Sequence, residues 1–158
     1  MANTQSMCTS FMGELMTATH NFGTAPIRAA GTADTFKAAL YLASATINAS
    51  TTAYSATGEV SGTNYTAGGI SVTNGTSPSS TNTSSTAGTA YWTPSASLSY
   101  TNVTLTTAFD AVLIYNSSKS NKAVSVHTFG SQTVTAGTFT LTMPSNTTST
   151  ALIRLATT

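Results

Sequence analysis

Charged residues are what this sequence has least of. Only 6% of its 158 residues are Asp, Glu, Lys or Arg, and the formal net charge is +1, whereas ordinary globular domains carry roughly 25% charged residues. Ser and Thr fill the gap and make up about a third of the chain. Because net charge normally keeps proteins apart in solution, we expect a surface that tolerates dense packing against neighbouring molecules.

The basic residues are too few and too scattered to form a nucleic-acid-binding surface, which needs Lys and Arg clustered on one face. They are Arg28, Lys37, Lys119, Lys122 and Arg154. Only Lys119 and Lys122 lie close together in the sequence, and a polar turn accounts for them. We therefore expect no nucleic-acid partner.

Cysteine and long apolar runs are also nearly absent. The single cysteine, Cys8, excludes an internal disulfide. It is either a small apolar residue before a helix or a thiol that bridges two chains. No apolar run reaches the length of about 18 residues that a membrane helix needs, and residues 1–10 lack the pattern of a signal peptide. We therefore expect no membrane partner and assembly in a cytoplasm.

The groups that catalysis and metal binding require are scarce as well. They are the carboxylates Glu14, Asp34, Glu59 and Asp110 and the imidazoles His20 and His127. The carboxylates show no spacing that favours a glycosidase pair, and the histidines and Cys8 lack metal-ligand spacing. The glycines at 67–69 lack the Lys of a phosphate-binding loop. The sequence therefore predicts no enzyme, no catalytic residue, no metal and no cofactor.

What is present is a pattern typical of β structure, with one exception. Residues 9–22 place Phe11, Leu15, Ala18 and Phe22 at helical spacing and predict a short amphipathic N-terminal helix. After this segment the apolar period changes to two, which is the period of a half-buried strand.

The predicted strands follow one another at short, regular intervals. They are residues 36–43, 58–62, 70–73, 98–105 with a bulge at Asn102, 109–115, 122–129, a separate hairpin over 132–143 that turns at 136–137, and 151–155. A polar hairpin loop is expected at 116–121 and a flexible Ser/Thr-rich loop at 77–89. About eight strands joined by hairpins favour a single domain, residues 1–158, that is mostly β: an antiparallel β-sandwich or jelly roll.

Four aromatic residues are candidates for contact with a partner. Tyr65, Tyr91, Trp92 and Tyr100 could form a platform for carbohydrate, but core packing or subunit contact is the simpler interpretation. We take Tyr65, Tyr91 and Trp92 as candidate partner-contact residues.

Several short motifs occur in an order that resembles a known group of proteins. They are His20-Asn21-Phe22-Gly23, Asp34 to Tyr41, Gly58-Glu59-Val60, Tyr65-Thr66-Ala67-Gly68-Gly69, Trp92, and Phe109 to Asn116. This order resembles small virion proteins of tailed bacteriophages. In that group a helix, a strand carrying Lys, a GYTAGG segment, a Trp before a polar strand and an AVLYN-like strand recur.

The resemblance implies a structural role in a virion, and for a small jelly-roll protein it implies capsid cementing or decoration. We therefore expect a trimeric cement protein on the phage head that contacts the major capsid protein and copies of itself. Two other readings stay open. One is a tail tube, adaptor or fibre-associated component, and the other is a carbohydrate-binding or adhesive β module.

Overall fold

The computed structural model describes residues 3–8, 11, 15, 19–20, 22, 33–81 and 88–156. The described chain is mostly β, as the sequence predicts. Its strands are β1 (Ser6–Met7), β2 (Phe36–Leu42), β3 (Ile70–Val72), β4 (Ser79–Ser80), β5 (Thr89–Trp92), β6 (Leu98–Asn116), β7 (Lys122–Leu141) and β8 (Ile153–Ala156). This part of the chain holds no helix long and apolar enough to cross a bilayer.

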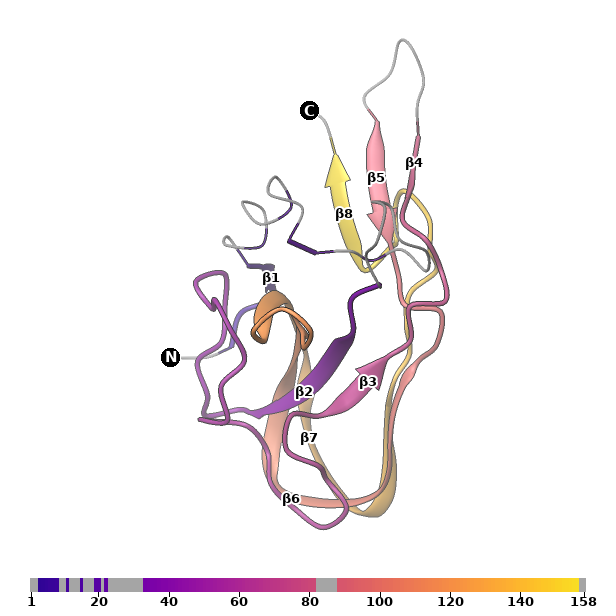
Figure 1. Ribbon diagram of the computed structural model, residues 1–158. Coiled ribbons are helices and arrows are strands. Elements are labelled where there is room, and N and C mark those ends of the chain that lie inside the picture. Colours follow the sequence, from indigo (N-terminus) through magenta and orange to yellow (C-terminus); the bar gives the residue numbers. More distant parts are fainter. Residues whose placement is uncertain are drawn as a thin grey trace.

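The strands form two antiparallel sheets (Figure 1). The larger sheet has the order β1-β7-β6-β2-β3, and the smaller has the order β4-β5-β8. β2 is therefore an internal strand, and five of its seven residues are buried. Burial of neighbouring residues on both faces explains why its apolar run is nearly continuous rather than strictly alternating. The mostly β, antiparallel prediction is confirmed, whereas the sandwich or jelly-roll arrangement stays a prediction.

The long hairpin of β6 and β7 shapes the larger sheet. Figure 1 shows that the two strands bend together into a U, with β2 and β3 between its arms. A predicted irregularity contributes to this bend: the register shifts between Tyr100 and Val103, and Asn102 has a φ of 56°. Bulges of this kind bend and twist a strand. The bulge expected at Asn102 is confirmed, and so is the polar turn between β6 and β7.

The separate hairpin predicted over 132–143 is wrong. These residues continue β7, and Ala136 at a φ of 47° forms a bulge where a turn was expected. The backbone N–H of Ala136 donates to Oγ1 of Thr104 on β6 at 3.0 Å. The part of β6 between Leu98 and Val103 pairs with residues 137–141. β7 therefore has a partner along its whole length and does not need to fold back on itself.

Two other predictions fall partly outside the described residues. The helix predicted at 9–22 is not seen, because only residues 11, 15, 19, 20 and 22 of that segment are described. Of the flexible loop predicted at 77–89, residues 82–87 lie outside the description. The two ends of that loop differ from the prediction, because Ser79 pairs with Tyr91 and Ser80 with Ala90.

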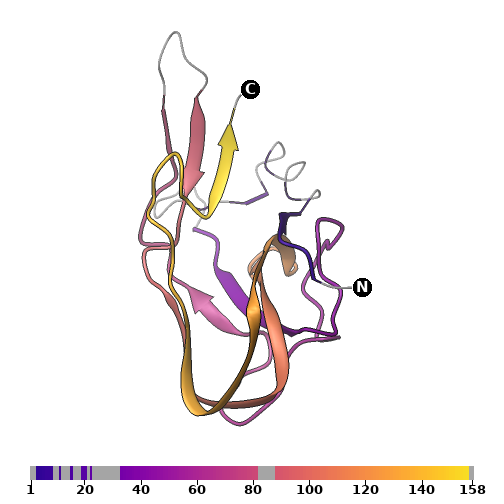
Figure 2. The ribbon, with the colours of Figure 1, turned by 180° about the vertical axis from the view of Figure 1, so that it is seen from behind.

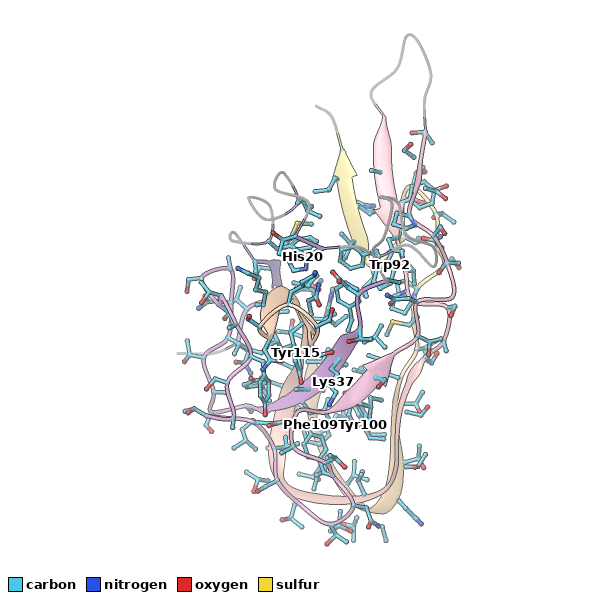
Figure 3. All side chains as sticks on the ribbon, in the orientation of Figure 1. His20, Lys37, Trp92, Tyr100, Phe109 and Tyr115 are labelled. Carbon is cyan, nitrogen blue, oxygen red and sulfur yellow. The ribbon has the colours of Figure 1, made fainter. Side chains whose placement is uncertain are left out.

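The buried core fills the inside of the U. At the bend, Phe109 packs edge-on against Phe139 at 5.0 Å between ring centroids. Toward the smaller sheet, Phe22 stacks on Phe36 at 4.5 Å and contacts Trp92 at 4.7 Å. Figure 3 shows Trp92 and His20 at one end of the larger sheet and Tyr100 and Phe109 at the other. The aromatic core therefore has two separate regions, one toward the smaller sheet and one at the bend of the U.

Candidate functional site

Tyr65 lies in a cluster of phenols around one carboxylate, which we call the Glu59 cluster. Its members are Glu59, Tyr41, Tyr54, Tyr65, Tyr100 and Tyr115. Glu59 is placed by an isolated bridge to Tyr41 on β2, and the adjacent Val60 N–H donates to Leu40 O at 3.0 Å. The cluster therefore lies against the most deeply buried strand of the molecule.

The Glu59 carboxylate accepts three hydrogen bonds. Tyr54 donates to Oε2 at 2.6 Å, and Tyr65 and the backbone N–H of Gly68 both donate to Oε1 at 2.8 Å. Tyr65 Oη in turn accepts the backbone N–H of Leu40 at 3.0 Å. Hydrogen bonds to an ionised group are shorter and stronger than neutral ones. The carboxylate thus fastens the loop segments that carry Tyr54, Tyr65 and Gly68 to β2.

The remaining phenols of the cluster bond backbone carbonyls. Tyr100 donates to Ala38 O at 2.8 Å and Tyr115 to Gly68 O at 2.7 Å. Burial is the main cause that raises the pKa of Tyr65 and Tyr100, and the Glu59 charge adds to it. Burial likewise raises the pKa of Tyr41 to about 12. The phenols therefore keep their protons and act as structural donors.

Tyr91 and Trp92 lie away from Tyr65, on β5. Trp92 is only 2% exposed, and its indole Nε1–H donates to Thr76 O at 3.0 Å. Tyr91 is half-buried. Trp92 and Tyr100 are thus core residues, as the simpler interpretation of the aromatics proposes, and the structure does not bring Tyr65, Tyr91 and Trp92 onto one surface.

An apolar cavity of about 190 Å³ lies beside Tyr91 and Trp92. Its other walls include Phe11, His20 and Leu155, and Leu155 is the large hydrophobic side chain that the described surface exposes, at 40%. Because the cavity is lined mostly by apolar side chains, it suits an apolar group and offers few polar atoms to orient a ligand.

A second hollow, of about 260 Å³, lies between β1, β7 and β8. Ser125 and His127 are two apart on β7, so their side chains share a face of the strand, and Ser125 Oγ lies 2.9 Å from His127 Nε2. Burial lowers the pKa of His127 to about 4. Ser125 is only 3% exposed, so a substrate carbonyl has little access to its hydroxyl.

A buried polar group ties the N-terminal segment to the β6–β7 turn. Asn116 donates from Nδ2 to Asp34 Oδ2 at 2.8 Å and lies 3.1 Å from His20 Nδ1. Lys119 completes the group with a 3.7 Å ion pair to Asp34. Cys8 is also fully buried, which fits a small apolar residue better than a thiol that bridges two chains.

The sequence did not point to two of these arrangements. Glu59 appears there only as a residue of a Gly-flanked turn, and its donors are separated from it by five, six and nine positions. The spacing of Ser125 and His127 on one strand was the available signal for the second. Within the described chain, no group of three or more His, Cys, Asp or Glu residues is placed to hold a metal ion.

In comparisons with known proteins, no family model, no curated protein and no solved structure matches the chain.

Proposed function

We propose that this chain is a non-enzymatic structural protein of a bacteriophage virion that cements or decorates the head by bridging major capsid subunits. The proposal rests on the order of short motifs that resembles small phage virion proteins. One observation in the structure supports it: residues 98–107 of β6 and 130–141 of β7, which we call the distal arm of the hairpin, have many exposed positions and carry no charge.

The exposed positions of this arm are almost all hydroxyl or amide residues. On β6 they are Ser99, Thr101, Asn102, Thr106 and Thr107, and on β7 they are Gly130, Ser131, Gln132, Thr133, Thr135, Ala136, Thr138 and Thr140. Burying an ionised side chain at an interface requires removing its water shell, which is costly unless the charge is paired. An arm without charges avoids that cost on its own side of an interface.

Such an arm suits an interface that is repeated many times. A standard protein interface buries roughly 1,600 Å² in total, and simultaneous contacts from one bound molecule to several coat subunits multiply its retention. Two antiparallel sheets are also the elements from which a jelly roll or sandwich is built. In this proposal the partners are the coat protein and other copies of the chain, arranged as a trimer.

The test is to count copies in purified particles of a phage that encodes this chain. Quantitative mass spectrometry is expected to find hundreds of copies per head, and a particle reconstruction is expected to place them on the outer surface. A few dozen copies would assign the chain to the tail instead, and absence from particles would refute the virion role.

A rebinding experiment separates cementing from incidental adsorption. Heads made without the chain should bind the purified protein to a saturable level that matches the copy number. Those heads should also survive heating better after rebinding. Binding that never saturates, or that leaves head stability unchanged, contradicts the proposal.

A further inference from the structure

β7 has a long outer edge that few described residues pair with. One side of β7 pairs with β6 from Lys122 to Leu141. On the other side, β1 pairs with Ser125 and Val126, and an isolated bridge joins Lys122 to Ala53. No described backbone pairing on this side lies beyond Val126. Figure 2 shows β7 along the outer rim of the U, and in the order of the sheet this edge is opposite β2 and β3.

The chemistry of this edge does not protect it. Natural proteins usually block exposed strand edges with charged residues or proline, because free N–H and C=O groups are a template for another strand. The sequence has no charged residue between Lys122 and Arg154, and no proline between Pro94 and Pro144. The bulge at Ala136 interrupts the edge, and the register with β6 shifts again on either side of Gln132.

Beyond that bulge the strand is regular. Phe139, Thr140 and Leu141 pair one to one with Tyr100, Ser99 and Leu98. We call residues 137–141 the outer segment of β7. Its exposure alternates, with Thr138 and Thr140 exposed and Phe139 and Leu141 half-buried, and Phe139 packs against Phe109 and Phe129 inside the U.

We propose that the outer segment of β7 pairs antiparallel with the same segment of a second copy, about a two-fold axis at Phe139. In this register Thr138 lies opposite Thr140 of the other copy, and the two Phe139 residues face each other. Directly opposed Thr–Thr and aromatic pairs are favourable cross-strand neighbours. The sheet then continues from one molecule into the next.

The symmetry of the segment is what selects a second copy as the occupant. Thr138-Phe139-Thr140 has the same residues in both directions from Phe139, so a two-fold strand pair sets Thr against Thr and Phe against Phe. The outer segment has no charge to oppose this pairing, and it has none with which to attract a charged partner strand. The two-fold contact is separate from the three-fold contact of the proposed trimer, and it does not depend on the virion role.

Charge reversal across the axis tests the proposal on the full chain. Sedimentation equilibrium is expected to show a concentration-dependent dimer for the natural protein. The double substitution T138K/T140K sets Lys against Lys twice and is expected to weaken the dimer about tenfold. The double substitution T138K/T140E sets Lys against Glu twice in the proposed register and is expected to restore it.

A matched control separates register from general charge. T106K/T107K adds the same two charges at exposed positions of β6 and should leave the dimer unchanged. Circular dichroism verifies that each variant folds. A natural protein that stays monomeric, a dimer that survives T138K/T140K, or a T138K/T140E variant that stays monomeric would each overturn the proposal. None of these outcomes bears on copy number in the virion, so the two proposals fail separately.

Discussion

The phenol of Tyr65 donates to Glu59 at 2.8 Å while it accepts the backbone N–H of Leu40 at 3.0 Å. One side chain thus links the carboxylate to the internal strand β2. Tyr54 and the backbone N–H of Gly68 donate the other two hydrogen bonds that the Glu59 carboxylate accepts. In a chain with only four carboxylates, this one serves to hold loops.

Replacing Glu59 should therefore cost stability. Glu59→Ala leaves three donors without their acceptor, and loss of hydrogen bonds to a charged group of this kind is expected to lower the free energy of unfolding by about 2 to 4 kcal/mol. Urea denaturation followed by circular dichroism measures this. Tyr54→Phe removes only one of the bonds and should cost about 1 kcal/mol. An equal effect of the two substitutions would mean that Glu59 does not organise the cluster.

Gly69 is expected to be intolerant of any side chain. Its φ is +73°, and a Cβ built there would lie 1.8 Å from the carbonyl oxygen of Ala38 on β2. Gly69→Ala should therefore displace the loop from β2 and yield little folded protein. Gly130→Ala is the control, because the nearest atom to its Cβ is Gln132 Nε2 at 4.0 Å; its stability should change by less than about 1 kcal/mol. Thermal unfolding of both variants decides between these outcomes.

Alkaline pH should unfold the protein cooperatively. The pKa values of Tyr41, Tyr54, Tyr65, Tyr100 and Tyr115 are all raised, chiefly by burial. The unfolded chain releases phenolic protons near pH 10 while the folded chain retains them. The stability that these phenols contribute is complete below pH 10 and is lost as the pH rises further. Tyrosinate absorbance should therefore appear together with the loss of circular dichroism, and gradual ionisation in a still-folded protein would contradict this.

Acid should destabilise the fold through His127. Its folded pKa of about 4 lies below the value of 6.5 for a free imidazole, so the unfolded chain binds the proton first. Stability is therefore complete above pH 6.5, falls between pH 6.5 and 4, and levels off below that range. The change amounts to about 3 kcal/mol.

A variant isolates this contribution from the carboxylates. His127→Gln keeps a polar group beside Ser125 but does not titrate. Urea denaturation at pH 7 and pH 5 should show a smaller loss of stability in the variant than in the natural protein. The same pH dependence in both proteins would refute the assignment to His127.

Trp92 should act as a core residue. Trp92→Ala removes a side chain that packs on Phe22 and Phe36 and is expected to cost about 3 to 5 kcal/mol. Trp92→Phe keeps most of the packing and loses the bond to Thr76, so it should cost less. Tyr91→Ala, at the adjacent half-buried position, is the control. Because Trp92 is the only tryptophan, circular dichroism rather than fluorescence must follow unfolding. A Trp92→Ala protein of natural stability would contradict its place in the core.

Local sequence was enough to determine the β character of this protein. The two-residue apolar period placed β2 within one residue at its end, and the polar stretch after Asn116 correctly marked the turn between β6 and β7. The phase slip at Asn102 located a real bulge, because alternation breaks wherever one strand gains an unpaired residue. Each of these features depends on neighbours within a few positions along the chain.

Tertiary structure alone decided what those strands become. Ala136-Gly137 is a bulge and not a turn, because β6 extends far enough to remain paired with β7. Glu59 acquires its role from Tyr54, Tyr65 and Gly68, which only the fold brings together, and Trp92 is buried by Phe22 and Phe36 from distant segments. Hydrogen-bond satisfaction and packing are properties of groups in space, so the alternation of residue types could predict strands but not the contacts between them.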